Sequence, residues 1–272
     1  MLKQRILTAI PLAALVIWGI LSQPAQVVFY ALLFVMAIAG WEWAALAGIA
    51  DKKLRAFYAL IITVLAYVLQ QTMLDKPQLL SVVLLAAVVI WLVAIYHMFS
   101  KGPQAVSPLF SKLKFILGFV ILLPPVVALM LIREQSAAWL FYCLSIVWIA
   151  DIGAYFSGKR YGKNKLAPGI SPGKTKEGLY GAVFATAAYS VLAGFYFELQ
   201  VISQIMLIII TVLTTFISVA GDLFLSLLKR ERGLKDTGNI LPGHGGILDR
   251  IDSVLSSAPF IALLLSAVIF NA

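Results

Sequence analysis

The sequence contains one cysteine, Cys143, and two histidines, His97 and His244, among its 272 residues. A single thiol cannot form an intramolecular disulfide, and a cysteine-based zinc site needs several thiolates. Two histidines also exclude a histidine-rich metal centre. These shortages direct the search for a metal site toward carboxylate oxygens.

Charge is scarce as well, since Asp, Glu, Lys and Arg together make up 12% of the chain. Hydrophobic residues make up 62%, whereas soluble domains typically have roughly 45–50%. The composition is that of an integral membrane protein, and we expect a single membrane domain over residues 1–272. Within it, N-terminal helices occupy residues 1–132, and residues 137–272 carry most of the polar motifs.

Apolar segments joined by short loops predict an all-α, polytopic membrane fold with about nine transmembrane helices. The first apolar segment resembles a signal peptide, but no small-x-small cleavage site follows it, so we expect a retained helix. The expected helices span residues 6–21, 27–47, 56–74, 79–99, 115–132, 137–156, 179–197, 203–228 and 252–270.

Basic residues occur mainly in alternate loops. If the N-terminus and every second loop are cytoplasmic, 19 of the 21 Lys and Arg residues lie on that side, leaving only Lys76 and Arg133 outside. Because positive residues favour cytoplasmic loops, this pattern predicts a cytoplasmic N-terminus and an external C-terminus. It also explains the net charge of +9 through topology and anionic lipid or nucleotide, and we expect no nucleic-acid partner.

A polar stripe runs along the eighth expected helix. At 3.6 residues per turn, its members fall on one helix face. They are Thr211, Thr215, Ser218, Asp222, Ser226 and Lys229. Hydrocarbon tolerates such groups only where they face protein, water or a ligand, so we expect the stripe to point into the helix bundle.

Carboxylates and basic residues follow the stripe. Asp249 and Asp252 are three residues apart and would share a helix face. Grouped carboxylates repel one another near a bilayer, so the cluster indicates a compensating cation, and hard oxygen ligands favour magnesium. The interleaved Lys and Arg residues indicate that phosphates accompany the metal.

These residues have a specific spacing. Ser226-x-x-Lys229-Arg230 is followed by Lys235-Asp236, by Pro242-Gly243-His244-Gly245-Gly246, and by Asp249-Arg250-x-Asp252. This segment resembles the signature of the phosphatidate cytidylyltransferase family, also called CDP-diacylglycerol synthases. The run Ser-Pro-x-Lys-Thr-x-Glu-Gly, which begins at Ser171, resembles a second block of the same family.

The resemblance implies a magnesium-dependent enzyme that joins CTP to phosphatidic acid and releases pyrophosphate. It implies an integral protein of the bacterial inner membrane, with the active site facing the cytoplasm, and it is compatible with a homodimer and with a second metal ion. The implied catalytic residues are Asp222, Asp249, Lys229, Arg230, Lys235, Asp236, His244 and Arg250. The implied substrate-binding residues are Ser171, Lys174, Thr175, Ser226, Gly243, Gly245 and Gly246.

The expected magnesium ligands are Asp222 and Asp249, with Asp252 and Asp151 as further candidates. We expect His244 to donate a hydrogen bond rather than to act as a general base, because a phosphate nucleophile is already an anion. Asp151 alternatively forms a simple helix-end pair with a lysine.

Other readings compete with this one. The run Gly169 to Thr175 imitates a Walker A phosphate loop, but Pro168 replaces its first glycine, so we reject an ATPase. The run still suits anion binding at the start of the next helix, although its lysines also serve as topology signals. For Glu42, beside two tryptophans, we favour a surface carboxylate in an aromatic belt over a catalytic role.

Two alternative functions differ from this one in their expected sequence features. A secondary transporter or channel would also contain intramembrane acids, but it would distribute them through the bilayer midplane. A CDP-alcohol phosphotransferase would need an Asp-Gly-x-x-Ala-Arg motif, which the sequence lacks. Charge gathered at one membrane face favours the interfacial enzyme.

Overall fold

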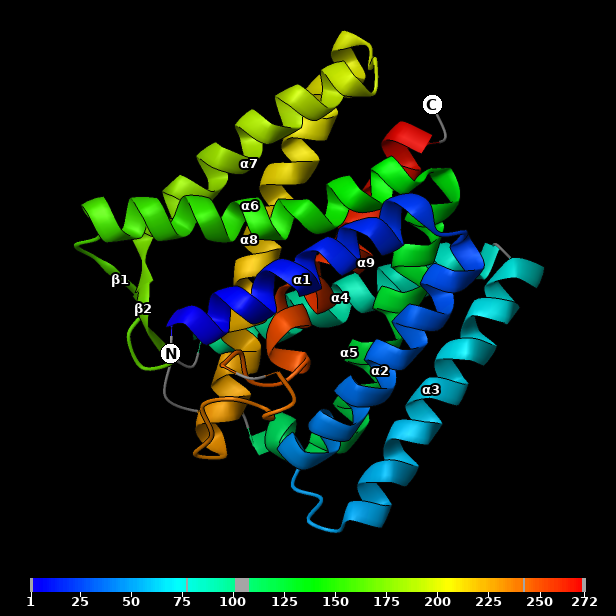
Figure 1. The fold of residues 1–272 in the computed structure, drawn as a ribbon, viewed down its shortest axis with the longest axis vertical. Helices are drawn as coiled ribbons and strands as arrows, with labels where there is room; N and C mark the ends of the chain where they lie inside the picture. The colour runs from blue at the N-terminus through cyan, green and yellow to red at the C-terminus, as the bar shows by residue number, and fades with distance from the viewer. Residues whose placement is uncertain (1, 77, 101–107, 242, 271–272) are drawn as a thin grey trace.

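The computed structural model describes residues 2–76, 78–100, 108–241 and 243–270, and these ranges are mainly helical (Figure 1). Pro242 of the family signature and Lys101 of the basic loops lie outside them. The helices are α1 (Leu2–Ser22), α2 (Ala25–Leu46), α3 (Lys52–Asp75), α4 (Gln78–Ser100), α5 (Pro108–Gln135), α6 (Ala137–Tyr161), α7 (Lys176–Tyr196), α8 (Val201–Glu231) and α9 (Leu248–Leu265). A π-helix, Ser266–Phe270, continues α9.

The expected polytopic all-α membrane fold is confirmed. Among the described residues, eight helices are long and apolar enough to cross a membrane, and α1 adds a shorter apolar helix at Ile10–Ser22. Large side chains such as Phe34, Phe184 and Phe195 are exposed on these helices. Apolar surface of this kind is stable when lipid covers it.

The segment between α6 and α7 differs from the expected loop. Strands β1 (Lys165–Ala167) and β2 (Ser171–Thr175) pair there as an antiparallel hairpin. Helix α7 begins directly after β2, because the Thr175 hydroxyl accepts a hydrogen bond from Gly178 N at 3.0 Å and caps the helix. The hairpin is therefore joined rigidly to the transmembrane helix that follows it.

Helix α8 ends in a glycine-dependent cap. Gly233 has a φ of 66°, and the amides of Gly233 and Leu234 donate to the carbonyls of Arg230 and Lys229. This is the Schellman arrangement, in which a left-handed glycine reverses the chain. We call the following connection, residues 232–247, the signature loop. It leads into α9, which begins four residues earlier than the sequence predicts, so Asp249 and Asp252 both lie inside the helix.

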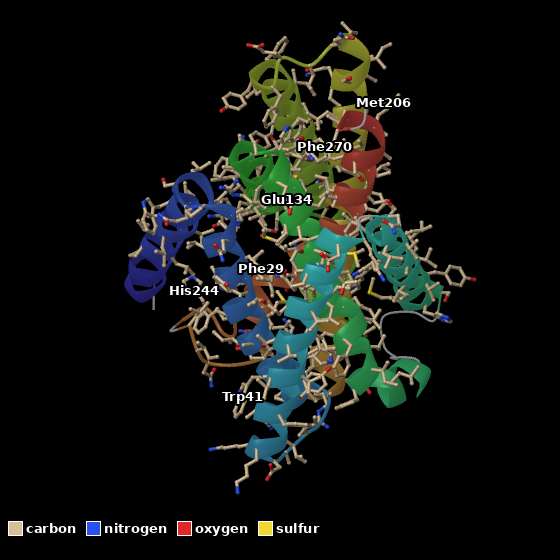
Figure 2. The ribbon with its side chains drawn as sticks, turned by 90° about the vertical axis from the view of Figure 1, so that its right-hand side faces the viewer. Phe29, Trp41, Glu134, Met206, His244 and Phe270 are labelled. Atoms are coloured by element: carbon tan, nitrogen blue, oxygen red, sulfur yellow. The ribbon has the colours of Figure 1, made fainter. Side chains whose placement is uncertain are left out.

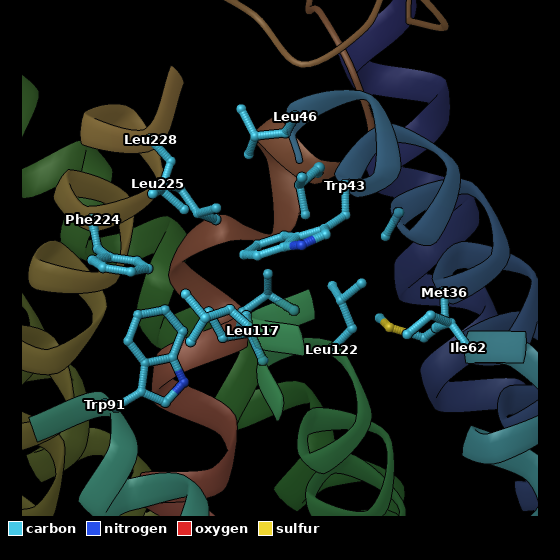
Figure 3. Close-up of a cluster of buried hydrophobic side chains, with 14 of the residues drawn as sticks. Met36, Trp43, Leu46, Ile62, Trp91, Leu117, Leu122, Phe224, Leu225 and Leu228 are labelled. Carbon is cyan, nitrogen blue, oxygen red and sulfur yellow. The ribbon is translucent and has the colours of Figure 1, made fainter. Parts of the chain in front are cut away.

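The core near the signature loop joins helices from both halves of the chain. Figure 3 shows Trp43 of α2, Trp91 of α4, Leu117 of α5 and Phe224 of α8 in one apolar cluster. Trp43 is fully buried and donates its indole N–H to the carbonyl of Lys114 at 2.8 Å. The prediction that Trp43 belongs to an aromatic belt at the membrane surface is therefore wrong. The prediction that Glu42 is a surface carboxylate is also wrong, because its side chain is buried.

The loops gather at two ends of the molecule. In Figure 1 the β1–β2 hairpin lies at the left, the signature loop at the lower left and the α2–α3 connection at the bottom, whereas the α7–α8 connection lies at the top and the C-terminal end of the π-helix at the upper right. Figure 2 places Trp41 in the lower part of the view and Phe270 in the upper part, with His244 below Glu134. The charge pattern predicts that the end with the hairpin faces the cytoplasm.

A cysteine introduced at Lys163 or Lys235 should react with a membrane-impermeant thiol reagent only from the cytoplasm. One introduced at Lys76 should react only from outside, because the positive-inside rule assigns these exposed positions to opposite faces. Labelling of inverted and right-side-out vesicles measures this, and the buried Cys143 adds little background. Equal sidedness for the Lys76 and Lys163 variants would contradict the expected topology.

Candidate active site

The polar stripe of α8 is buried in the bundle, as the sequence predicts. Thr211, Thr215, Ser218, Ser226 and Lys229 all have exposed fractions of 9% or less. At its inner part, Thr215 donates to the hydroxyl of Thr186 on α7 at 2.9 Å. Toward the signature loop, the stripe changes from hydroxyls to charges, and these charges form the candidate site.

Asp222 connects α8 to the hairpin. Its Oδ2 atom forms an ion pair with the Lys174 ammonium of β2, and its Oδ1 atom accepts a hydrogen bond from the Ser226 hydroxyl at 3.2 Å. The two blocks of the family resemblance, one in the hairpin and one after Asp222, thus meet at a single carboxylate. The sequence predicts a role for each of these residues, but it does not predict this contact.

Asp249 is held by four donors. Its Oδ1 atom accepts from the Lys229 ammonium at 2.7 Å, while Oδ2 accepts from the amides of Thr237 and Gly246 at 2.8 and 3.0 Å and from the Thr237 hydroxyl at 3.0 Å. Both members of the ion pair are buried. A carboxylate in this setting needs such compensation, because burial of an unpaired charge is costly.

Three acidic side chains from three helices form an electrostatic cluster, and Lys229 interacts with two of them, Asp222 and Asp252. Asp222 of α8 interacts with Asp151 of α6 and with Asp252 of α9. In the described part of the chain, no three His, Cys, Asp or Glu side chains already stand close enough to hold a metal. The carboxylates of Asp151, Asp222 and Asp252 nevertheless have the right chemistry for magnesium. This ion prefers oxygen ligands and binds through one or two carboxylates plus water and phosphate.

A cavity of about 560 Å³ lies beside this cluster. Asp151, Tyr155 and Lys159 of α6 line it, together with Lys174 of the hairpin. Apolar side chains such as Leu179 and Val219 complete the wall. Because the cavity combines apolar walls with two lysines and a carboxylate, it suits a molecule that carries both phosphate and hydrocarbon.

The remaining predicted catalytic residues are spread around the loop. Arg230 donates to the carbonyls of Ile170 in the hairpin turn and Leu234 in the loop, at 3.3 and 3.1 Å. Arg250 is exposed and interacts electrostatically with Asp151. Lys235 and Asp236 are exposed on the signature loop, and the amide of His244 donates to the carbonyl of Leu241.

The predicted substrate-binding residues divide into two groups. Lys174 and Thr175 line the cavity, although the Thr175 hydroxyl also caps α7, and the half-buried Ser171 begins strand β2. Gly243 and Gly245 have φ values of 77° and 83° and form a tight turn, closed by the bridge between Leu241 and Gly245. Such a turn requires glycine for its backbone conformation alone.

Glu42 of α2 lies next to the candidate site, which the sequence analysis did not predict. Its carboxylate is 2% exposed and accepts from the amides of Ile247 and Leu248 at 3.1 and 2.7 Å, where α9 begins. The Thr237 hydroxyl lies 3.2 Å from Glu42 Oε2 as well as 3.0 Å from Asp249 Oδ2, so its one hydrogen can be donated to either carboxylate. The one available signal was the presence of a carboxylate in an otherwise apolar segment, which is a site hypothesis by default.

The fold and the site define a class: an integral membrane protein with a charged, phosphate-compatible centre at one end of its helix bundle. Sequence comparison identifies the family within that class. A sequence profile of the Cytidylyltransferase family matches residues 3–268, and the chain belongs to this family.

Individual relatives agree with the family match. A phosphatidate cytidylyltransferase of Pseudomonas aeruginosa is 39% identical over 272 residues, covering 98% of each chain. One of Haemophilus influenzae is 36% identical over 284 aligned positions, covering 96% of this chain and 97% of the relative. A third, of Bacillus subtilis, is 44% identical over 133 residues, about half of each chain.

The substitution Lys229→Met should destabilise the protein strongly. It keeps the apolar stem but leaves the buried Asp249 without its cation, which typically costs about 3–5 kcal/mol. We expect the low end of that range, because three hydrogen bonds to Asp249 remain. Unfolding in mixed micelles with increasing dodecyl sulfate, followed by circular dichroism, measures the loss.

Two further variants serve as controls for this pair. The double variant Lys229→Met/Asp249→Asn should regain part of the lost stability, since no charge is left unpaired. Lys174→Met removes a more exposed ammonium and should cost less. Equal stability of Lys229→Met and the parent protein would show that the pair contributes no net stabilisation.

Proposed function

We propose that the charged centre between the hairpin, α6, α8 and α9 transfers the cytidylyl group of CTP to phosphatidic acid, forming CDP-diacylglycerol and pyrophosphate. Family membership and the names of the full-length relatives support this activity. The observation that carries the site is the ion pair between Lys174 and Asp222. It joins the two motifs of the family resemblance beside a cavity that can admit a phosphate.

In the reaction, a phosphate oxygen of phosphatidic acid attacks the α-phosphorus of CTP. A new P–O bond forms, the bond between the α-phosphorus and the bridging oxygen breaks, and pyrophosphate leaves with the bonding electrons. No proton has to be removed from the nucleophile at neutral pH, so catalysis depends on positioning and charge neutralisation. Lys159 and Lys174, which line the cavity, are placed to bind phosphate oxygens there.

The lipid can reach this centre from the bilayer. Asp222 lies seven residues before Lys229, which corresponds to roughly 10 Å along α8. A lipid phosphate at the membrane surface therefore needs to descend only a short way to approach the acidic cluster. We assign the site to the cytoplasmic face of a bacterial inner membrane, because the basic residues gather at this end.

Magnesium, when bound, would offset the negative charge of the nucleotide phosphates. Asp222 is the shared ligand in our proposal, and the second carboxylate comes from Asp249 or Asp252. These two candidates differ in their present partners. Asp249 would have to release Lys229, whereas Asp252 accepts a hydrogen bond from the amide of its neighbour Ser253 at 2.7 Å and would have no ion pair of that length to break. A released Lys229 would become available to a substrate phosphate.

Purified protein should release pyrophosphate only when CTP, phosphatidic acid and magnesium are all present. Lys174→Ala should lower turnover at least tenfold with little loss of folded protein, because it removes a charge aimed at the cavity rather than a core contact. Lys163→Ala, which removes an equal charge from an exposed position, is the matched control. Absence of magnesium-dependent pyrophosphate release in the parent protein would instead favour a transporter.

The carboxylate ligands can be separated by titrating magnesium against activity. Asp222→Asn should abolish most turnover, since it removes a charge without changing size. Of Asp249→Asn and Asp252→Asn, the variant that needs a higher magnesium concentration for half-maximal activity has lost the second ligand. Near-normal turnover of folded Asp222→Asn would refute its assignment as a ligand.

A further inference from the structure

Glu42 brings the N-terminal half of the chain into the candidate site. It extends from α2 to the start of α9. There its carboxylate accepts hydrogen bonds from the amides of Ile247 and Leu248. The residue at the N-cap of α9 is Ile247, which has no side-chain oxygen to do this. Glu42 therefore replaces a local cap from more than 200 positions away in the sequence, and the positive end of the helix dipole favours its charge.

The glycines of the signature loop are packed around this carboxylate. A Cβ atom at Gly238 would lie 2.5 Å from Glu42 Oε1, and one at Gly246 would lie 2.5 Å from both carboxylate oxygens and 2.4 Å from the Thr237 hydroxyl. Side chains are therefore excluded at these two positions by Glu42. The family resemblance implies that Gly246 binds substrate. Contact with Glu42 and Thr237 is sufficient by itself to explain why this position is a glycine.

Thr237 transmits the effect of Glu42 to the charged centre. Its hydroxyl lies 3.2 Å from Glu42 Oε2 and 3.0 Å from Asp249 Oδ2, although it has only one hydrogen to donate. Its amide donates to Asp249 as well, at 2.8 Å. Asp249 in turn holds Lys229. A continuous chain of contacts thus runs from α2, through one loop residue, to two predicted catalytic residues.

We propose that Glu42 is a positioning residue for the cytidylyl transfer: it fixes Thr237 and the start of α9, and thereby sets the place of Asp249 and Lys229. This inference rests on the proposed function of the site. A residue that served only as a helix cap would stabilise the fold but would leave the chemistry of each folded molecule unchanged. The two roles therefore predict different kinetics.

The test compares Glu42→Ala, Glu42→Asp and the parent protein in detergent, below the unfolding temperature of each. We expect kcat per folded molecule to fall about 10- to 100-fold in Glu42→Ala, with KM for CTP within about twofold of the parent value, because loss of an outer support misplaces the acting groups. Glu42→Asp keeps the charge and should recover part of kcat. Thr186→Val, which removes a buried hydroxyl contact between α7 and α8, should lower stability but not kcat.

Hydrogen exchange supplies a readout that does not depend on activity. In Glu42→Ala, the amides of residues 237–241 and 243–249 should exchange faster, whereas those of α6 and α7 should not change. If Glu42→Ala does not fold, Thr237→Val cuts the same chain of contacts while keeping a β-branched side chain, and it should lower kcat in the same direction. The double variant should be little worse than either single one, because both act on one path.

Each outcome decides between the two roles. A parent-like kcat per folded molecule in Glu42→Ala, or in Thr237→Val, would reduce Glu42 to a structural cap. A lower kcat without faster exchange in residues 237–241 and 243–249 would show that the effect does not pass through the loop, which also overturns the proposal. An inactive parent protein would refute the proposed function instead, and it would do so before any variant is compared.

Discussion

Carboxylates placed among transmembrane helices need donors from the protein, and this requirement organises the end of the molecule that carries the site. Glu42, Asp222 and Asp249 each come from a different helix, and each is held by donors from another element. In hydrocarbon, an unpaired carboxylate would cost several kcal/mol or more. The helix ends, the hairpin and the signature loop are therefore held where their amide and ammonium groups can donate hydrogen bonds to the carboxylate oxygens.

The same arrangement suits phosphate chemistry. Lysines that neutralise carboxylates can exchange those partners for phosphate oxygens without moving their backbone, since both partners are anionic oxygens. Lys174 already stands between Asp222 and the cavity. Charged side chains in the apolar bundle are thus paired with opposite charges. A site that stabilises a multiply charged transition state needs such fixed charges.

Rigidity around the site comes from both halves of the chain. The apolar cluster of Figure 3 packs α2, α4, α5 and α8 together, and Lys114 of α5 pairs with Glu231 at the end of α8 at 2.7 Å. The N-terminal helices therefore anchor the protein in lipid and also support the position of the signature loop. Division into an N-terminal part and a catalytic part describes where the motifs lie, while the packing crosses that boundary.

The sequence by itself determined the membrane class, the approximate positions of the helices, the inward direction of the α8 stripe and the family motifs. These features depend on composition, helical periodicity and local spacing, all of which are readable along the chain. Only the tertiary structure decided that Ser171–Thr175 is a strand, that Lys174 pairs with Asp222, and that Glu42 is buried against the start of α9. Those outcomes depend on which distant segments meet, and an isolated carboxylate such as Glu42 has the same sequence pattern whether it ends in water or at a helix terminus.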